Sequence, residues 1–435
     1  MMKILKLSTL LLLLSISVQA QEVWTLEKCV NRAIDKNISI KQSQADMKST
    51  SLSKTTAIAN FLPSLNLGSS HSWNVGLNQN FTTDPLENMT TTSANVGIHL
   101  FNGLQNIQQL YRANLSILAS QYQLEDMKEN ISLLVANSYL QILFNRESLG
   151  VQKSQLNVAN EELIIAKERL NTGIIPQGDV LEIEANVATI EQNVVVAENN
   201  YQLSKISLAQ LLLISKVDNF EIAQETAIIP KSTILNTNVN SIYLTAVAKR
   251  NDVKLAETNL KIAKKNLAIS RGNVLPKLSG SYSYNSGVLF NGSNDDSNII
   301  VFPAKAGQVF GLNLSIPIFN GMTNNTNISR NKINIQKSTY ALEQVKLDLE
   351  NTINQAYNDA KGSLKAHQAA EKTLKARKLA YQYAKERFDN GGMNTFNFLQ
   401  AGQRYEAAQS ELIKTKYNYI FKLKVLEFYF GEASL

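Results

Sequence analysis

The side chains that most often carry catalysis are scarce in this sequence. It has three histidines, His71, His99 and His367, and a single cysteine, Cys29, in 435 residues. It contains no glycine-rich phosphate-binding motif and no Cys/His group at metal-ligand spacing. These residues leave no catalytic triad, metal cluster or nucleotide site to assemble, so we expect a protein that is not an enzyme and needs no cofactor.

One short segment that begins with Glu-Arg occurs twice in the sequence. The segment ERLNTGIIPQGDVLEIE begins at Glu168, and ERFDNGGMNTFNFLQAG begins at Glu386, a shift of 218 residues (386 − 168). Gly173 and Gly391 can adopt the left-handed backbone conformation that ends a helix. Pro176 stops the first helix from continuing. Each copy therefore predicts a turn that joins two helices.

Matches outside the turn indicate that a much longer unit is repeated. FNG at Phe101 matches FNG at Phe319 with the same shift of 218, and LPSL at Leu62 matches LPKL at Leu275 with a shift of 213. A repeat of this length is typical of a duplicated architecture rather than a short-period solenoid. We expect two structural repeats, residues 21–220 and 221–435, each with the order helix, two strands, long helix, turn, helix.

The first twenty residues have the features of a signal peptide. Lys3 and Lys6 precede an apolar run from Leu10 to Leu14, and small residues suited to cleavage end at Ala20. We expect residues 1–20 to be removed and the protein to leave the cytoplasm.

The net charge of the mature chain is mildly positive. Without Lys3 and Lys6 the 43 basic residues fall to 41, against 36 acidic ones. They are scattered, without a basic patch, which argues against a nucleic-acid partner. Cys29 is expected to pack inside a helical core.

Most of the mature sequence has helical character. From Leu104 to Thr172 there is no proline and one glycine, so a continuous helix there would be about 100 Å long. Apolar residues recur within it every seven positions, as in a coiled coil: Val135, Ile142, Leu149, Leu156, Leu163 and Leu170. Residues 323–390 are the counterpart in the second half. Shorter helices are expected at 26–60, 180–213, 241–271 and 396–429.

Four segments alternate between apolar and small polar residues, which is the period of a β-strand. In one of them Ala94, Val96, Ile98 and Leu100 lie opposite Ser93, Asn95, Gly97 and His99. Polar outer loops are expected at 78–92 and 291–306. The expected junctions between helix and strand are marked by residues that stop or turn the chain: Pro63, Pro276, Gly103 and Gly321.

An apolar-out, polar-in pattern of about ten residues is typical of a membrane barrel that encloses water. A soluble sandwich could show the same alternation, but four isolated strands between such long helices have no second sheet to cover their apolar faces. After the signal there is no apolar run of about 18 residues, so strands must make any membrane contact. Because four strands cannot close a barrel, several chains must share one.

In the order in which these motifs occur, the sequence resembles the TolC family of outer-membrane efflux proteins over essentially the whole mature chain. The resemblance rests on the duplicated element order, the LPSL/LPKL and LFNG/IFNG junctions and the ERLNTG/ERFDNG turns. It implies a mostly α fold with membrane β-strands. Three chains would share a 12-stranded barrel in the outer membrane, continued by a periplasmic α-barrel of coiled-coil helices.

The same resemblance implies a function and partners. The homotrimer would be the exit duct of a tripartite efflux pump or type I secretion system, in contact with outer-membrane lipid, a periplasmic adaptor protein and an inner-membrane transporter. The alternative is a trimeric coiled-coil structural protein or adhesin with a small barrel anchor. That alternative needs a passenger region, whereas this chain has only short outer loops.

By resemblance, the repeated turns would dock the adaptor. The residues concerned are Arg169, Leu170, Asn171, Gly173, Arg387, Phe388, Asp389 and Gly391. A purely structural alternative is that these residues only cap helices.

The resemblance also implies a periplasmic gate, and here the sequence departs from its relatives. Asn397 and Gln400 stand where the family's gate carries Asp, and Phe388 and Met393 replace its Tyr and Arg, while Asp179 and Glu182 remain in the first repeat. Since Phe388 and Met393 cannot form charge-assisted hydrogen bonds, we expect closure by packing of apolar residues: Ile174, Ile175, Met393, Phe396 and Phe398.

Overall fold

The computed structural model describes residues 23–74, 87–223, 229, 232–292, 299–303 and 306–430. The expected signal peptide and the tips of the expected outer loops lie outside the described residues. The chain divides into two compact units. Unit 1 consists of Met1–Gln42, Glu125–Arg250 and Leu347–Leu435, and unit 2 of Ser43–Leu124 and Asn251–Lys346.

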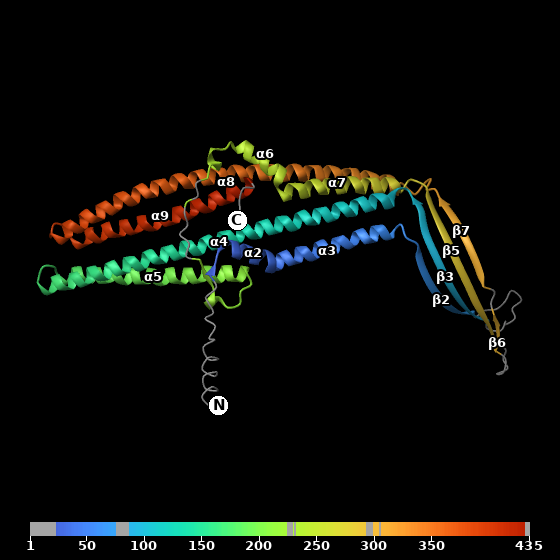
Figure 1. Ribbon diagram of the computed structural model, residues 1–435, viewed down its shortest axis with the longest axis horizontal. Coiled ribbons are helices and arrows are strands. Elements are labelled where there is room, and N and C mark those ends of the chain that lie inside the picture. Colours follow the sequence, from blue (N-terminus) through green and yellow to red (C-terminus); the bar gives the residue numbers. More distant parts are fainter. Residues whose placement is uncertain are drawn as a thin grey trace, which may run out of the picture. The chain divides into compact units, whose positions relative to one another are not determined.

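Two helical hairpins form most of unit 1 (Figure 1). The first joins α4 (Gln105–Asn171) to α5 (Gln177–Leu211), and the second joins α8 (Thr323–Asp389) to α9 (Thr395–Phe430). Helices α4 and α8 each contain 67 residues. The two long helices expected from the sequence are thus confirmed to within one residue at each end.

The seven-residue stripe of α4 is a packing surface, as its spacing predicts. Val135 and Ile142 are fully buried. Towards the turn, Leu156 and Leu163 pack against Val187 and Ile190 of α5, and Leu163 and Leu170 belong to the next cluster along the hairpin.

Two expected helices are each broken into two. The first divides into α2 (Leu26–Lys36) and α3 (Ile38–Ala59), and the second into α6 (Val239–Lys249) and α7 (Asn251–Gly272). The breaks fall at Asn37 (ψ 133°) and Arg250 (ψ 134°), whose extended backbone interrupts the helical hydrogen bonds. The side chain of Asn37 accepts hydrogen bonds from the amides of Ser39 and Ile40. That of Arg250 donates to Asp126 and Glu129 of α4. The bonds of Asn37 compete with a continuous helix because they occupy backbone amides, whereas those of Arg250 fix the break against α4.

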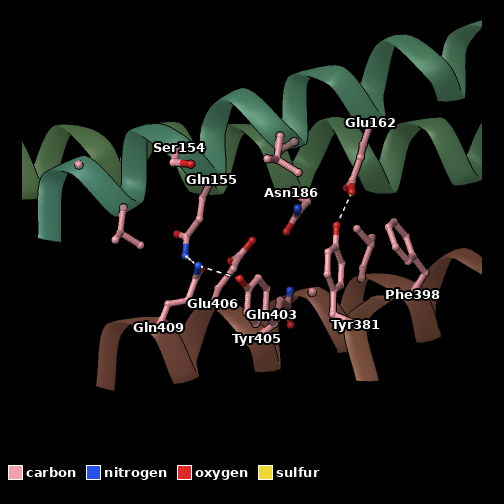
Figure 2. Close-up of a pocket in the computed structure, with 16 residues that line it drawn as sticks. Ser154, Gln155, Glu162, Asn186, Tyr381, Phe398, Gln403, Tyr405, Glu406 and Gln409 are labelled. Carbon is pink, nitrogen blue, oxygen red and sulfur yellow. Dashed lines mark hydrogen bonds between the residues drawn. The ribbon is translucent and has the colours of Figure 1, made fainter. Parts of the chain in front are cut away.

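The two hairpins of unit 1 contact each other through polar and aromatic side chains (Figure 2). The Gln155 amide of α4 donates to Gln409 of α9 (3.0 Å), and the Tyr381 hydroxyl of α8 donates to Glu162 of α4 (2.5 Å). A cavity lies between the hairpins beside these contacts.

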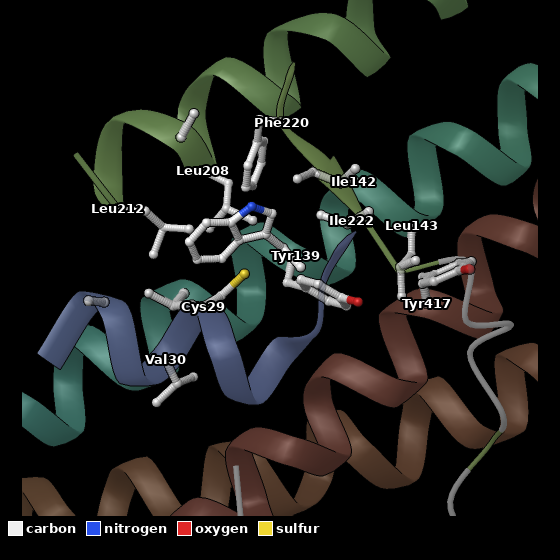
Figure 3. Close-up of a cluster of buried hydrophobic side chains, with 14 of the residues drawn as sticks. Cys29, Val30, Tyr139, Ile142, Leu143, Leu208, Leu212, Phe220, Ile222 and Tyr417 are labelled. Atoms are coloured by element: carbon white, nitrogen blue, oxygen red, sulfur yellow. The ribbon is translucent and has the colours of Figure 1, made fainter. Parts of the chain in front are cut away.

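At the other end of unit 1 lies its main hydrophobic core (Figure 3). Trp24 of β1 (Val23–Trp24) packs on Phe220, at a ring-centre distance of 5.9 Å. Strand β1 pairs in parallel with β4 (Glu221–Ile222). In the sequence, β4 lies between two short helices, η1 (Val217–Asn219) and η2 (Ile234–Asn236). Cys29 is fully buried in this core, and burial raises the pKa of its thiol to about 12. The expectation that Cys29 is a packing residue is therefore confirmed.

Unit 2 contains an antiparallel sheet (Figure 1). β2 (Ser64–Asn74) pairs with β3 (Glu87–Asn102), and β3 pairs with β5 (Lys277–Gly292). Two strands, β6 (Ile299–Pro303) and β7 (Gly307–Ser315), pair with successive parts of β5. The expected fourth strand, residues 309–318, corresponds to β7, whereas β6 lies within the segment 291–306 that was expected to be an outer loop. β7 ends before the expected Ile318 because Pro317 has no amide to donate to the ladder.

The expected loops are shorter than predicted, because β3 already begins at Glu87 and β5 continues to Gly292. The small polar residues that suggested loops occupy strand ends, where the cross-strand ladder satisfies their backbone.

The two faces of the sheet differ as the alternation predicts. Leu65, Val96, Tyr282 and Phe310 form one row of cross-strand partners on the same face. Phe310 and Leu312 are 78% and 76% exposed in the single chain. The opposite face carries small polar residues, such as Asn313 and its partner Ser279. An exposed apolar surface of this kind marks contact with a membrane or another protein.

Among the described residues, no helix is long and apolar enough to span a bilayer.

Candidate functional site: the paired hairpin turns

Both turns end their helices with the same hydrogen-bonded motif. The amide of Gly173 donates to the carbonyl of Leu170, and that of Ile174 to Arg169. In the second turn Gly391 donates to Phe388, and Gly392 to Arg387. Gly173 and Gly391 have φ of 76° and 73°. This pairing is the Schellman motif, so the capping role predicted for both glycines is confirmed.

The two turns also contact each other through Arg169. Its guanidinium lies 2.9 Å from an Asp389 carboxylate oxygen and 5.4 Å from the centre of the Phe388 ring. Phe388 in turn stacks on Phe398 at 4.5 Å between ring centres. We call Arg169, Phe388 and Asp389 the turn clasp. It supplies a charge-assisted hydrogen bond and a cation–π contact between the hairpins of one chain.

The turn clasp could not be predicted from either turn alone, because it joins residues of both turns. The one available signal is a difference between the copies. At the shift of 218, Asp389 of the second turn corresponds to Asn171 of the first. The second turn therefore has an acidic residue at this position, which can pair with Arg169 of the first turn, and the first turn has a neutral one.

Of the other residues predicted to dock an adaptor, four are exposed to solvent and one is partly buried. Asn171, Gly173, Arg387 and Gly391 are exposed. Leu170 is partly buried in the cluster formed by Ala166, Val180 and Ile183. The turns therefore present exposed polar side chains and exposed glycine backbone to solvent.

The predicted gate residues lie just beyond the turns. Asp179 and Glu182 are in the first two turns of α5, while Met393 precedes α9 and Asn397 and Gln400 lie within it. Glu182 and Asn397 are exposed, and the other three are partly exposed.

The apolar residues expected to close the gate do not gather within one chain. Phe398 is buried against Phe388 and Tyr381, and Ile175 packs in the α4/α5 hairpin. Ile174 and Phe396, in contrast, are 70% and 71% exposed. Phe398 thus belongs to the interior of the paired hairpins. Ile174 and Phe396, and in part Met393, are exposed and could contact another molecule.

The predicted junction residues lie where helix and strand meet. Pro63 and Pro276 directly precede β2 and β5. Gly103 (φ 55°) and Gly321 (φ 61°) follow the returning strands, each ahead of a second residue with positive φ, Leu104 or Met322. The surroundings of the glycines differ. A Cβ on Gly103 would lie 2.2 Å from the Gly272 carbonyl oxygen, whereas one on Gly321 would meet nothing within 4 Å.

Long paired helices that end in capped turns, together with a sheet whose apolar face is exposed, define the class of outer-membrane export channels. The chain matches the family model described as outer membrane efflux protein over residues 29–212 and 242–432. It belongs to this family.

Individual relatives agree with this assignment. The chain is 21% identical to the outer membrane protein TolC of Vibrio cholerae over 318 residues, which cover 71% of this chain and 69% of TolC. A crystal structure of CusC has the same fold, with a TM-score of 0.79 at 18% identity, covering 94% of this chain and 92% of that one. The CmeC channel of Campylobacter jejuni gives a TM-score of 0.78 at 17% identity, covering 94% and 85%.

Family membership gives the location and general role of the protein. It is an outer-membrane efflux channel of the TolC family, with its sheet at the membrane and its helical part in the periplasm. The family consists of transport ducts and not of enzymes. The duct function is therefore supported over the adhesin alternative.

Proposed function

We propose that three copies of this chain form the outer-membrane exit duct of a tripartite efflux pump or type I secretion system. The observation that carries the assembly is the open sheet. Among the described strands, β2 pairs only with β3, and β7 only with β5. Unpaired strand edges are not tolerated in lipid. Four strand positions from each of three chains, with β6 and β7 sharing one position, would give a closed barrel of about twelve strands.

The mass of the detergent-purified protein tests this assembly. We expect a stable trimer. A stable monomer with its full β-structure content would contradict the shared barrel.

The duct is proposed to work with a periplasmic adaptor and an inner-membrane transporter, and the transporter would select the substrate. The exposed parts of the turns, Asn171, Gly173, Arg387 and Gly391, are the surface offered to the adaptor. The turn clasp supports this role because it holds the two turns of one chain in a single arrangement.

Replacing Gly391 with Val should abolish export while leaving the trimer in the membrane, because a β-branched residue resists positive φ. The measurement is export activity together with cross-linking to the adaptor. Gly362→Val is the matched control, since Gly362 lies in the regular helix α8 and an added Cβ there meets nothing within 4 Å. Normal export and cross-linking in Gly391→Val would leave the turn with a capping role alone.

At the periplasmic gate, we propose that Asn397 and Gln400 set the width of the pore rather than its charge. Replacing both with Asp should raise the cation selectivity of the channel in planar-bilayer recordings, because carboxylates at a constriction attract cations. An unchanged reversal potential would place the narrowest point elsewhere.

The division into repeats 21–220 and 221–435 is likewise a proposal. It is supported by the equal lengths of α4 and α8 and by the helix breaks at Asn37 and Arg250. These breaks are 213 residues apart (250 − 37), the same shift that relates LPSL to LPKL.

A further inference from the structure

The cavity between the two hairpins of unit 1 has a volume of about 260 Å³. Its walls come from α4 and α5 on one side and from α8 and α9 on the other (Figure 2). It lies further along the hairpins than the turn clasp and contains none of the residues assigned above to docking. Of the residues expected to close the gate it contains only Phe398, which is buried between the hairpins. Drug-sized ligands occupy pockets of about 300 Å³ or more, so this cavity suits a smaller molecule.

One wall of the cavity is aromatic. The ring of Tyr381 stacks with Tyr405 at 5.4 Å between centres and an angle of 11°, and with Phe398 at 5.8 Å and 23°. The Gln409 amide donates to the Tyr405 hydroxyl (3.1 Å) and accepts from Gln155 (3.0 Å). These contacts keep the rings and amides in place, so the cavity has a preformed wall.

Two carboxylates, Glu162 of α4 and Glu406 of α9, line the same space. Glu162 accepts the hydrogen bond from Tyr381 and lies 3.8 Å from the ammonium nitrogen of Lys385. Glu406 has no hydrogen bond or ion pair to any residue that the structure describes. None of the residues that line the cavity is basic. The cavity therefore holds one carboxylate without a counter-ion.

The electrostatics agree with this geometry. Burial raises the pKa of Glu406 to about 7, and the Glu162 carboxylate adds to the effect. Burial also raises the pKa of Glu162, although Tyr381 and Lys385 oppose the increase. Near neutral pH, binding of a cation beside Glu406 can therefore displace the proton from its carboxyl group.

A carboxylate beside aromatic rings in a partly desolvated cavity is the chemistry that recognises organic ammonium groups. We propose that this cavity binds a small organic cation, with the Glu406 carboxylate as its counter-ion and the wall of Tyr381, Tyr405 and Phe398 against its apolar body. The proposed binding does not depend on the identity of the pump.

The test uses benzylamine as the probe and the full chain purified in detergent at pH 8. Titration calorimetry should show saturable binding of benzylamine and at least tenfold weaker binding of benzyl alcohol, which has nearly the same shape without the charge. Glu406→Gln should weaken benzylamine binding at least tenfold. Glu161→Gln is the matched control and should change it less than twofold, because Glu161 is exposed on α4 and does not line the cavity.

The pH dependence provides a second readout. Benzylamine stays protonated from pH 5 to 8, so its affinity should fall as the pH drops below about 7 and Glu406 takes up a proton. The titratable groups that line the cavity with Glu406 are Glu162 of α4, Tyr381 of α8 and Tyr405 of α9, while α5 contributes the neutral Asn186. Lys385 of α8 pairs with Glu162 and does not line the cavity. Binding near pH 7 should release protons to the buffer, and Glu406→Gln should abolish most of that release.

A third readout shows whether Glu406→Gln is folded. Because the carboxylate is held without a counter-ion, the variant should melt at a higher temperature than the parent at pH 8 and at the same temperature at pH 4. The inference is overturned if benzylamine does not bind saturably, if benzyl alcohol binds as well, or if Glu406→Gln and Glu161→Gln behave alike.

Discussion

Lysine in place of Leu312 should destabilise the assembled protein by about 2–4 kcal/mol, which is the cost of a lysine on the lipid face near the middle of a membrane barrel. Leu312 lies within β7, and its side chain is 76% exposed in the single chain. The apolar face of the sheet continues across β2, β3, β5 and β7, so the side chain at this position is expected to face lipid in a barrel. The measurement is equilibrium unfolding from lipid bilayers.

The neighbouring residue supplies the control. Asn313 projects to the opposite face, where its cross-strand partner is Ser279. Asn313→Lys should therefore cost less than about 1 kcal/mol, since the lumen of a barrel tolerates polar substitutions. Equal costs at positions 312 and 313 would contradict the assignment of the two faces.

The second large effect is expected at Gly103, where alanine should cost about 2–5 kcal/mol. The new Cβ would lie 2.2 Å from the Gly272 carbonyl oxygen, which is backbone and cannot rotate away. To this overpacking of about 1–3 kcal/mol is added the left-handed conformation (φ 55°), which costs an alanine about 1–2 kcal/mol.

Gly321→Ala separates these two contributions. Gly321 has a similar φ of 61°, but an added Cβ meets no atom within 4 Å. We expect this variant to lose only the conformational term, about 1–2 kcal/mol. Thermal unfolding of the two variants beside the parent measures the difference. If they lose the same stability, then the close approach of Gly103 to Gly272 does not contribute.

Features encoded by a long regular pattern could be predicted from the sequence. The stripe from Val135 to Leu170 defines α4 over many turns, and alternation defines both faces of the sheet. The turn motifs were also predictable, because Gly173 and Gly391 each meet a backbone requirement that few residues satisfy.

What could not be predicted depends on residues that meet only in three dimensions. The breaks at Asn37 and Arg250 interrupt otherwise helical sequence, and Arg250 forms its ion pairs with residues 121 and 124 positions away (250 − 129 and 250 − 126). The turn clasp joins Arg169 to a residue 220 positions away (389 − 169). No local pattern encodes such pairs. Strand β6 was missed for a different reason, because its sequence, IIVFP, is apolar throughout and shows no alternation.

The core around Trp24 has a consequence for the order in which the protein folds. Most of its members, from Trp24 to Ile222, lie in the first half of the chain, but Ile413 and Tyr417 come from the last helix. Tyr417 and Lys416 also bind Glu147, about 270 residues earlier in the chain. Contacts between such distant residues form slowly, because a long loop must close first. Because the chain is synthesised from its N-terminus, this core stays incomplete until α9, which supplies Ile413 and Tyr417, has been made.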